Sequence, residues 1–287
     1  MTQHYLVRPE SFGATLYDPA TLGYTFLHQE QYDQLARTQG WPIHRSDTPA
    51  LLAADPSGGR FAALMRQAKS ADIRLRPVPE PLPTDSLAAP VRVYFELTTR
   101  CNGRCRYCLN GSGQRIRHPE LTTAEALRII AALGQDGVFE VRLTGGEATL
   151  RPDFFDLAQA VRAAGMALTL NSNLLISQSQ VQRLIALRPD LLITSLDASE
   201  QAHGRTRGPG FGRILAHVRA LRASGIPVRL NCLLSAETLP DLAAFADQAH
   251  PEGRVAAHAA GRHVEVARLE ELERQHPAGK QHGAEGK

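Results

Sequence analysis

Strand-like apolar runs and helical segments alternate along the second half of the chain. Five apolar runs have the length and residue types of β-strands, and they cover residues 91–98, 139–144, 166–171, 190–196 and 227–234. The segments between them carry apolar residues at the three- and four-residue spacing of amphipathic helices. Strands joined through helices pair in parallel with right-handed crossovers, so the pattern predicts an open doubly wound sheet or a barrel. Either fold places reactive side chains at the carboxyl ends of its strands.

Individual residues mark the ends of two of these helices. Thr122 and Glu125 have the spacing of a capping box, and we expect Gly134 to end that helix with a positive φ. Pro152 suits the first turn of the next helix, and Gly165 is its expected stop. The βαβα order therefore has explicit boundary signals as well as the right periodicity.

The first quarter of the chain has a different pattern. Three short strand-like runs at 4–8, 13–18 and 23–28 are separated by turn residues, and a helical run follows at 30–37. A second helical run lies at 60–69. We therefore expect a small α+β unit of winged-helix-like arrangement.

The chain divides into four predicted parts. Residues 1–76 form the α+β unit, and residues 77–90 form a stiff linker because their five prolines favour extended backbone. Residues 91–260 form the α/β domain, with a sixth strand at 253–258. Residues 261–287 form an amphipathic helix and then a polar tail, which we expect to be disordered.

Composition and charge narrow the possible functions. Apolar residues make up 43% and charged residues 21% of the chain, both near the averages of globular proteins. The 32 basic and 29 acidic residues nearly cancel, so the net charge gives no reason to expect a nucleic-acid partner. No apolar run has the ~18 residues of a membrane span, and the start lacks the apolar stretch of a signal peptide. We therefore expect a cytoplasmic protein without membrane contact.

Three of the four cysteines lie within eight residues, directly after the first strand of the α/β domain. The spacing of Cys101, Cys105 and Cys108 suits three reduced thiolates, each bound to a different iron of a cubane cluster. Such a cluster keeps one iron without a protein ligand, and that iron can bind a substrate or cofactor. A structural zinc site with His118 as fourth ligand and a chance cluster of cysteines are the alternatives.

This cysteine spacing, with Tyr107 before the last cysteine, resembles the signature of the radical S-adenosylmethionine (radical SAM) superfamily. Further resemblance lies within residues 91–250, where residues 141–153 resemble the family's Gly-Gly-Glu motif and residues 195–197 its Ser-Leu-Asp turn. The resemblance implies a partial parallel (β/α)6 barrel, a [4Fe-4S] cluster held by the three cysteines, and S-adenosyl-L-methionine as the second cofactor. It assigns cofactor binding to Tyr107, Gly145, Gly146, Glu147, Ser172, Ser195, Asp197 and Arg207.

Several of these residues also have simpler interpretations. A Gly-Gly turn commonly does no more than connect a strand to a helix, and Ser195 or Asp197 could cap the helix that follows. Arg142 is the candidate catalytic residue, because the matching arginine of a related molybdenum-cofactor radical enzyme meets its nucleotide substrate. A salt bridge on the barrel exterior is the alternative for Arg142.

The N-terminal unit resembles a domain that captures the leader of a ribosomally synthesised precursor peptide. Such domains bind a peptide by adding a strand at an exposed sheet edge, although an accessory or dimerisation role is the alternative here. Together the two resemblances imply an enzyme that makes a 5′-deoxyadenosyl radical and modifies a precursor peptide, with flavodoxin or ferredoxin as reductant. The competing hypotheses are a radical SAM oxidoreductase of cofactor or small-molecule biosynthesis, and an iron–sulfur or zinc protein without turnover.

Overall fold

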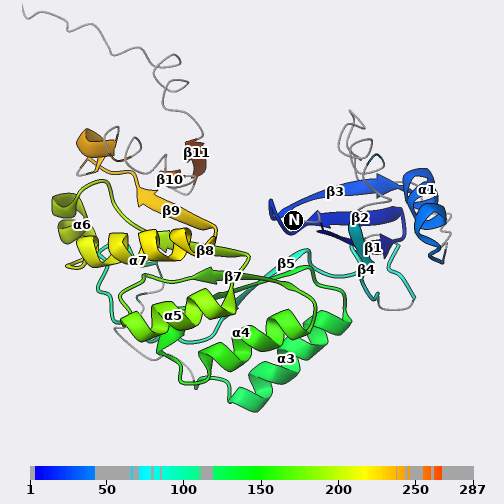
Figure 1. Ribbon diagram of the computed structural model, residues 1–287, viewed down its shortest axis with the longest axis horizontal. Coiled ribbons are helices and arrows are strands. Elements are labelled where there is room, and N and C mark those ends of the chain that lie inside the picture. The colour runs from blue at the N-terminus through cyan, green and yellow to red at the C-terminus, as the bar shows by residue number, and fades with distance from the viewer. Residues whose placement is uncertain are drawn as a thin grey trace, which may run out of the picture.

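The computed structural model contains a smaller sheet in the first part of the chain and a larger sheet in the second (Figure 1). It describes residues 4–42, 66, 71–78, 81–84, 86–109, 111, 119–236, 238–242, 245, 255–259 and 262–266. The helical pattern at 60–69 lies outside the described residues except for Arg66, and the C-terminal tail from 267 onward lies outside them as well. Within the described part of the chain, no helix combines the length and apolar content needed to cross a membrane.

The larger sheet has the strand order β11-β10-β9-β8-β7-β6-β5. Its strands are β5 (Arg92–Glu96), β6 (Glu140–Thr144), β7 (Ala167–Asn171), β8 (Leu191–Ser195), β9 (Val228–Leu233), β10 (Val255–Ala259) and β11 (Arg262–Val266). Strands β5 to β10 pair in parallel, and β11 pairs with β10 in the antiparallel direction. The five predicted strands and the sixth are confirmed, and with them the partial (β/α)6 barrel.

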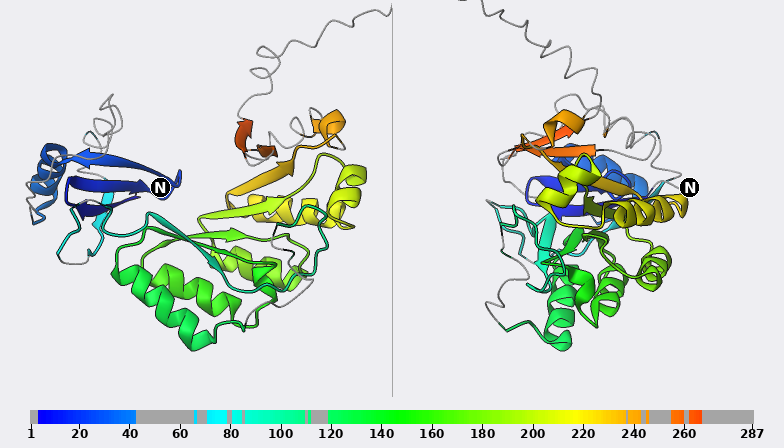
Figure 2. Two further views of the ribbon diagram at one scale, coloured as in Figure 1. Left: turned by 180° about the vertical axis from the view of Figure 1, so that it is seen from behind. Right: turned by 90° about the vertical axis from the view of Figure 1, so that its left-hand side faces the viewer.

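The helices between these strands cover the outer face of the sheet (Figure 2). They are α3 (Thr123–Gln135), α4 (Phe154–Ala163), α5 (Gln178–Leu187), α6 (Glu200–Thr206) and α7 (Phe211–Ala223), with short 3-10 turns η1 (Ala148–Leu150) and η2 (Leu239–Asp241). Strand alternation decides which side chains meet them. On β6, Val141 and Leu143 belong to the core formed with the helices, so Arg142 and Thr144 point to the opposite, inner face.

The helix boundary signals are confirmed in part. Thr122 caps α3, accepting a hydrogen bond from the Glu125 amide, while its own amide donates to the Glu125 carboxylate at 2.8 Å. Gly165 follows α4 with a φ of 74°. The prediction for Gly134 is wrong, because α3 continues past it and the positive φ of 79° falls at Gly137. A Cβ at Gly134 would lie 2.8 Å from the Cβ of Ala164, so this glycine lets α3 pack closely on the end of α4.

The predicted C-terminal helix is also wrong where the structure describes it. Of the predicted segment 261–287 the structure describes Arg262–Val266, which form β11 and extend the sheet beyond the sixth parallel strand. A short segment with alternating apolar residues fits either element, and pairing with β10 decides the outcome here.

The smaller sheet has the order β3-β2-β1-β4, so β3 and β4 are its edge strands. The predicted strands and helix are confirmed as β1 (His4–Glu10), β2 (Gly13–Asp18), β3 (Gly23–His28) and α1 (Gln29–Gln39). Strand β4 (Asp72–Leu75) was not anticipated, and it pairs with β1 in parallel. The winged-helix-like type and the four-part division of the chain stay predictions.

The larger sheet and its helices form the partial barrel, which we call the half-barrel. The N-terminal unit packs on the half-barrel near the amino-terminal ends of the half-barrel strands. Tyr17 of β2 stacks on Phe139, with the ring centroids 5.3 Å apart, and its hydroxyl donates to Glu140 at 2.9 Å. Leu6 and Ala167 complete this buried cluster. In Figure 1 the unit therefore lies at the opposite end of the strands from α6.

Two buried arginines join the units through backbone carbonyls. Arg8 is fully buried, pairs with Glu10 at 2.8 Å, and donates to the carbonyls of Ala89, Pro90 and Gly137. Arg76 donates to four further carbonyls, those of Gly134, Val138, Ala164 and Gly165. The end of the proline-rich segment is thus held in the interface by the Arg8 guanidinium.

We predict that Arg8→Met lowers the free energy of unfolding by about 3 to 5 kcal/mol, because Glu10 loses its partner in a buried site. Arg37→Met is the control, since the Arg37 side chain is 66% exposed and its loss should cost under ~1 kcal/mol. Urea denaturation measures both. Equal losses in the two variants would contradict a structural role for the Arg8 contacts.

Candidate active site

A cavity of about 440 Å³ opens at the carboxyl ends of the parallel strands. Most of the predicted site residues line it, namely Cys101, Cys105, Tyr107, Cys108, Gly145, Gly146, Ser172, Ser195 and Arg207. Glu147, Asp197 and Arg142 are not among the lining residues. The structure thus brings together side chains from the loops after β5, β6, β7 and β8, as the carboxyl-end rule leads us to expect.

The glycine loop after β6 lies against the start of the cysteine loop. The Gly146 amide donates to the carbonyl of Thr98 at 2.7 Å, and the Glu147 amide to that of Arg100 at 2.8 Å. A Cβ at Gly145, where φ is 135°, would lie 2.3 Å from the Thr98 oxygen, and one at Gly146 would lie 2.2 Å from the Arg100 oxygen. Glycine is therefore required at both positions by the neighbouring loop.

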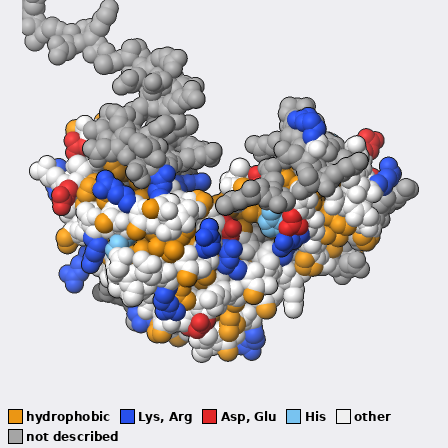
Figure 3. Space-filling model, in the orientation of Figure 1, with side chains coloured by type: hydrophobic (Ala, Val, Ile, Leu, Met, Phe, Trp, Pro, Cys, Tyr) orange, Lys and Arg blue, Asp and Glu red, His pale blue; other side chains and the backbone are white. Residues whose placement is uncertain are grey.

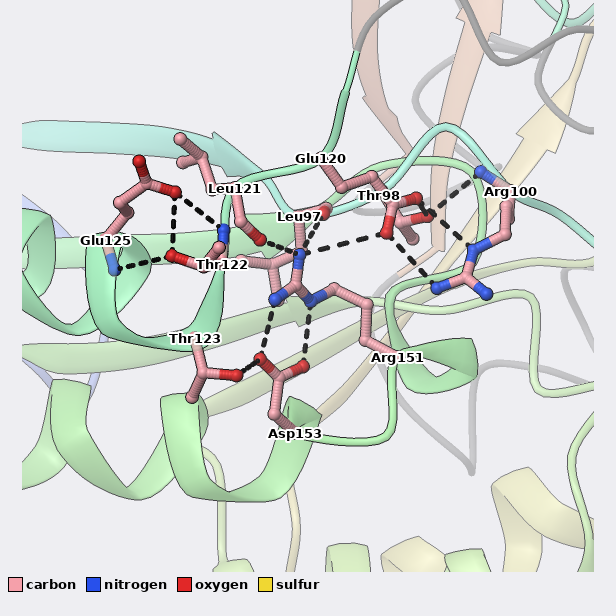
Figure 4. A network of polar contacts seen from close by, with 10 residues as sticks. All are labelled: Leu97, Thr98, Arg100, Glu120, Leu121, Thr122, Thr123, Glu125, Arg151 and Asp153. Carbon is pink, nitrogen blue, oxygen red and sulfur yellow. Dashed lines mark hydrogen bonds and ion pairs between the residues drawn. The ribbon is translucent and has the colours of Figure 1, made fainter.

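Arg151 holds together the two ends of the cysteine loop, near Leu97 and Leu121 (Figure 4). One of its terminal nitrogens donates to the carbonyls of Leu97 and Leu121, at 3.1 and 3.0 Å, so it binds the chain both before and after the cysteines. Asp153 holds the guanidinium through two bonds of 2.8 and 2.6 Å. These bonds lower the pKa of Asp153 to about 2. Sequence reasoning missed Arg151, because its partners are carbonyls that no motif marks.

A second set of contacts in Figure 4 joins the same two ends of the cysteine loop. The Glu120 carboxylate accepts hydrogen bonds from Thr98 and from Arg100, the latter at 3.1 and 3.3 Å. The residues just before Cys101 are thus tied to a residue just before α3. Both ends of the loop have fixed positions, although residues 112–118 within it lie outside the described part of the chain.

Glu147 joins the glycine loop to the loop after β7. Its carboxylate is fully buried and accepts hydrogen bonds from the hydroxyls of Thr149 and Ser172, at 2.6 and 3.0 Å, and from the Asn173 amide at 2.7 Å. Burial raises the pKa of Glu147. Its observed contacts are with the protein, so direct cofactor binding by this side chain stays a prediction.

Asn173 extends these contacts to the cysteines. Its side-chain amide donates to Asn102 at 2.8 Å and lies 3.7 Å from the Cys101 sulfur, toward which the Gly103 amide also points at 3.3 Å. Burial raises the pKa of the Cys101 thiol, while the Gly103 hydrogen bond acts in the opposite direction. Sequence reasoning assigned the neighbouring Ser172 but not Asn173.

The donor set fits a multi-iron cluster. Among the described residues, no three Cys, His, Asp or Glu side chains gather closely enough to hold a single metal ion. Cys101, Cys105 and Cys108 line the same cavity from one loop, so three thiolates there can each bind a different iron, and hydrogen bonds to a cysteine sulfur tune such clusters. His118 of the zinc alternative lies outside the described residues. Cys232 is fully buried in the core on the outer face, where burial raises its pKa to about 11.

Asp197 orients Arg207 at the cavity. The Asp197 carboxylate is fully buried, and it accepts from the Arg207 Nε at 2.8 Å, the Thr206 hydroxyl at 2.6 Å and the Leu233 amide at 2.9 Å. Ser199 caps α6, so the capping alternative for Ser195 and Asp197 is wrong. Arg207 is the member of this pair that lines the cavity.

Asn171 and Asn231 are among the cavity residues that sequence reasoning did not assign. They line the cavity from β7 and β9, and their side-chain oxygens are buried without a hydrogen-bond partner among the described residues. Buried polar atoms are costly unless they are bonded, so these oxygens mark places where a bound molecule can donate. The alternation of inward- and outward-facing side chains along β7 and β9 was the sequence signal that could have placed both residues on the inner face.

Arg142 lies on the inner face of β6, two residues before Thr144, which lines the cavity. It donates to the Tyr94 hydroxyl at 3.0 Å and approaches Glu140 at 3.4 Å. The alternative of an exterior salt bridge is wrong, because the outer face of β6 carries Val141 and Leu143. A catalytic role for Arg142 stays a prediction.

Comparison with known proteins agrees with this geometry. The model of the radical SAM superfamily matches residues 95–249, more than half of the chain. The chain belongs to the radical SAM superfamily. Members of this superfamily use a [4Fe-4S] cluster and S-adenosylmethionine.

Its curated relatives are longer proteins. An AdoMet-dependent heme synthase of Methanosarcina barkeri is 34% identical over 174 residues, covering 59% of this chain and 50% of the relative. A PqqA peptide cyclase of Ruegeria pomeroyi is 31% identical, covering 56% and 44%. The chain thus spans about half the length of these relatives.

Among solved structures, Streptococcus suis SuiB bound to S-adenosylmethionine has a similar fold. The TM-score is 0.62 at 18% identity, and the match covers 96% of this chain and 68% of SuiB. The match of anSMEcpe with bound AdoMet covers 59% of this chain and 51% of that protein, with a TM-score of 0.51 at 16% identity. The likeness to SuiB therefore extends into the N-terminal unit.

We predict that Gly146→Ala displaces the chain before Cys101 and lowers the iron bound after anaerobic reconstitution, because its Cβ meets backbone oxygens. Such overpacking typically costs about 1 to 3 kcal/mol. Gly212→Ala is the control, since nothing lies within 4 Å of a Cβ at that helix position. Iron content equal to wild type in Gly146→Ala would show that the two loops do not need this close approach.

Proposed function

We propose that this chain is a radical SAM enzyme that modifies a ribosomally synthesised precursor peptide in the cytoplasm. The observation that carries the proposal is the single cavity that holds three separate thiols beside the glycine loop and Arg207. When bound, the [4Fe-4S] cluster and S-adenosylmethionine supply a 5′-deoxyadenosyl radical that removes a hydrogen atom from the substrate. Flavodoxin or ferredoxin is the proposed electron donor.

The chain's own residues bind and orient these groups. Cys101, Cys105 and Cys108 would hold the cluster, and Tyr107 lines the same cavity from the same loop. Arg207, fixed by the Asp197 carboxylate, pairs with an anionic group of the cofactor. The other proposed cofactor contacts are those of the glycine loop and the strand ends, namely Gly145, Gly146, Ser172, Ser195, Asn171 and Asn231.

The N-terminal unit supports a peptide substrate. Strand β3 is an edge of its sheet, and an extended leader peptide could add to that edge through backbone hydrogen bonds. The structural likeness to SuiB covers this unit, and SuiB has been crystallised with its precursor peptide SuiA. Relatives named for peptide cyclisation and for mycofactocin maturation support the same class of substrate.

Cofactor biosynthesis is the second candidate. It is favoured by the 34% identity to the heme synthase. In that case the N-terminal unit would have a structural role and would stabilise the half-barrel through the buried contacts of Arg8 and Arg76. The two candidates differ in whether a peptide stimulates turnover.

The test is anaerobic reconstitution followed by measurement of 5′-deoxyadenosine after reduction. Wild-type protein and Cys232→Ala should retain iron and release 5′-deoxyadenosine, whereas Cys105→Ala should lose the cluster and release none. A precursor peptide encoded beside the gene should gain a mass change. Full iron retention in Cys105→Ala would contradict the cluster assignment, and turnover of a small molecule without any peptide would favour the second candidate.

A further inference from the structure

A second cavity of about 460 Å³ lies where the N-terminal unit meets the half-barrel. On one side it is lined by the β2–β3 turn at residues 20–22. On the other side it is lined by residues at the amino-terminal ends of β8 and β9, including Leu191 and Arg229. It is therefore placed at the opposite end of the strands from the cysteine loop.

The two cavities follow one another along the inner face of the sheet. Leu191 lines the second cavity and Ile193 the active-site cavity, and both lie on the same face of β8. On β9, Arg229 lines the second cavity and Asn231 the first. Residues two apart on a strand are separated by only about 6.6 Å, so the two cavities lie next to one another along β8 and β9.

The inner face of the sheet near the second cavity carries excess positive charge. Arg229 is half-buried and forms no hydrogen bond or ion pair within the described part of the chain. Arg142 is 8% exposed, and its Nε has no partner there. Arg142 shares its acid, Glu140, at 3.4 Å, with Arg92 at 2.6 Å and with the Tyr17 hydroxyl at 2.9 Å, so this one carboxylate faces two arginines.

The remaining charged groups of the second cavity do not remove this excess. Asp190 accepts hydrogen bonds from Arg162 at 3.2 Å and from the Leu168 amide at 2.8 Å, so this acid already has partners of its own. Figure 3 shows basic side chains gathered where the half-barrel meets the N-terminal unit. A half-buried cation without a paired acid is costly, so Arg229 indicates a site for an anionic ligand.

We propose that the second cavity receives an acidic side chain or the carboxyl terminus of the substrate peptide, with Arg229 as its partner. This proposal rests on the proposed function, because the peptide would continue from Arg229 along β8 and β9 to the cysteine loop. The planar guanidinium binds a carboxylate through two parallel hydrogen bonds, so the site selects acidic segments over neutral ones.

Calorimetric titration of the reconstituted full chain with tetraglutamate tests the proposal, with tetraglutamine and inorganic phosphate as comparison ligands. Tetraglutamate should bind, and Arg229→Gln should weaken it roughly tenfold, the value of a charge-assisted hydrogen bond. Arg213→Gln, at an exposed position of α7, should bind as wild type does. Equal binding of tetraglutamine, an unchanged affinity in Arg229→Gln, or phosphate binding as tightly as tetraglutamate would overturn the proposal.

Arginine modification by phenylglyoxal gives a second readout that needs no variant. Tetraglutamate should protect Arg229 from modification in the wild-type protein and leave Arg213 reactive, as read by peptide mass spectrometry. Equal reactivity of Arg229 with and without tetraglutamate would overturn the proposal. Both measurements are independent of 5′-deoxyadenosine release, so failure of radical chemistry and failure of this binding site can be told apart.

Discussion

The backbone of the glycine loop runs in direct contact with the backbone that leads into the cysteines, and the active site depends on this approach. Two amide-to-carbonyl hydrogen bonds, from Gly146 and Glu147, join the loops where any Cβ on the glycines would overlap an oxygen. Arg151 then ties both ends of the cysteine loop together, and Glu147 ties the glycine loop to the strand end beside it. The thiols are therefore positioned by neighbouring strands rather than by their own loop alone.

The other end of the half-barrel is organised by buried arginines. Arg8 and Arg76 donate to backbone carbonyls at the ends of helices and strands of the half-barrel. The N-terminal unit thus binds polar backbone groups of the half-barrel, and β3 is an edge strand of the sheet that the structure describes. In this arrangement the unit lies beside the second cavity and at a distance from the cysteines, which suits capture of a substrate away from the chemistry.

The parts of the structure that follow from local sequence were predictable, and those that depend on distant contacts were not. Strand alternation and the capping box at Thr122 depend on near neighbours, and the cysteine spacing lies within one loop. The bond between Tyr17 and Glu140 joins residues 123 positions apart, and the Arg151 contacts end on carbonyls, so neither leaves a local pattern. The same reason explains Gly146, whose neighbour in space comes from another loop. Gly134 was misjudged because a glycine that permits helix packing looks the same in sequence as one that ends a helix.

Electron paramagnetic resonance of the reconstituted, chemically reduced wild-type chain tests the central claim most directly. Three cysteines on one cavity wall leave one iron of a cubane cluster open to S-adenosylmethionine. The account predicts the signal of a reduced [4Fe-4S] cluster, and it predicts that adding S-adenosylmethionine changes that signal. A chain that binds zinc in place of iron, or a cluster signal that S-adenosylmethionine leaves unchanged, would contradict it.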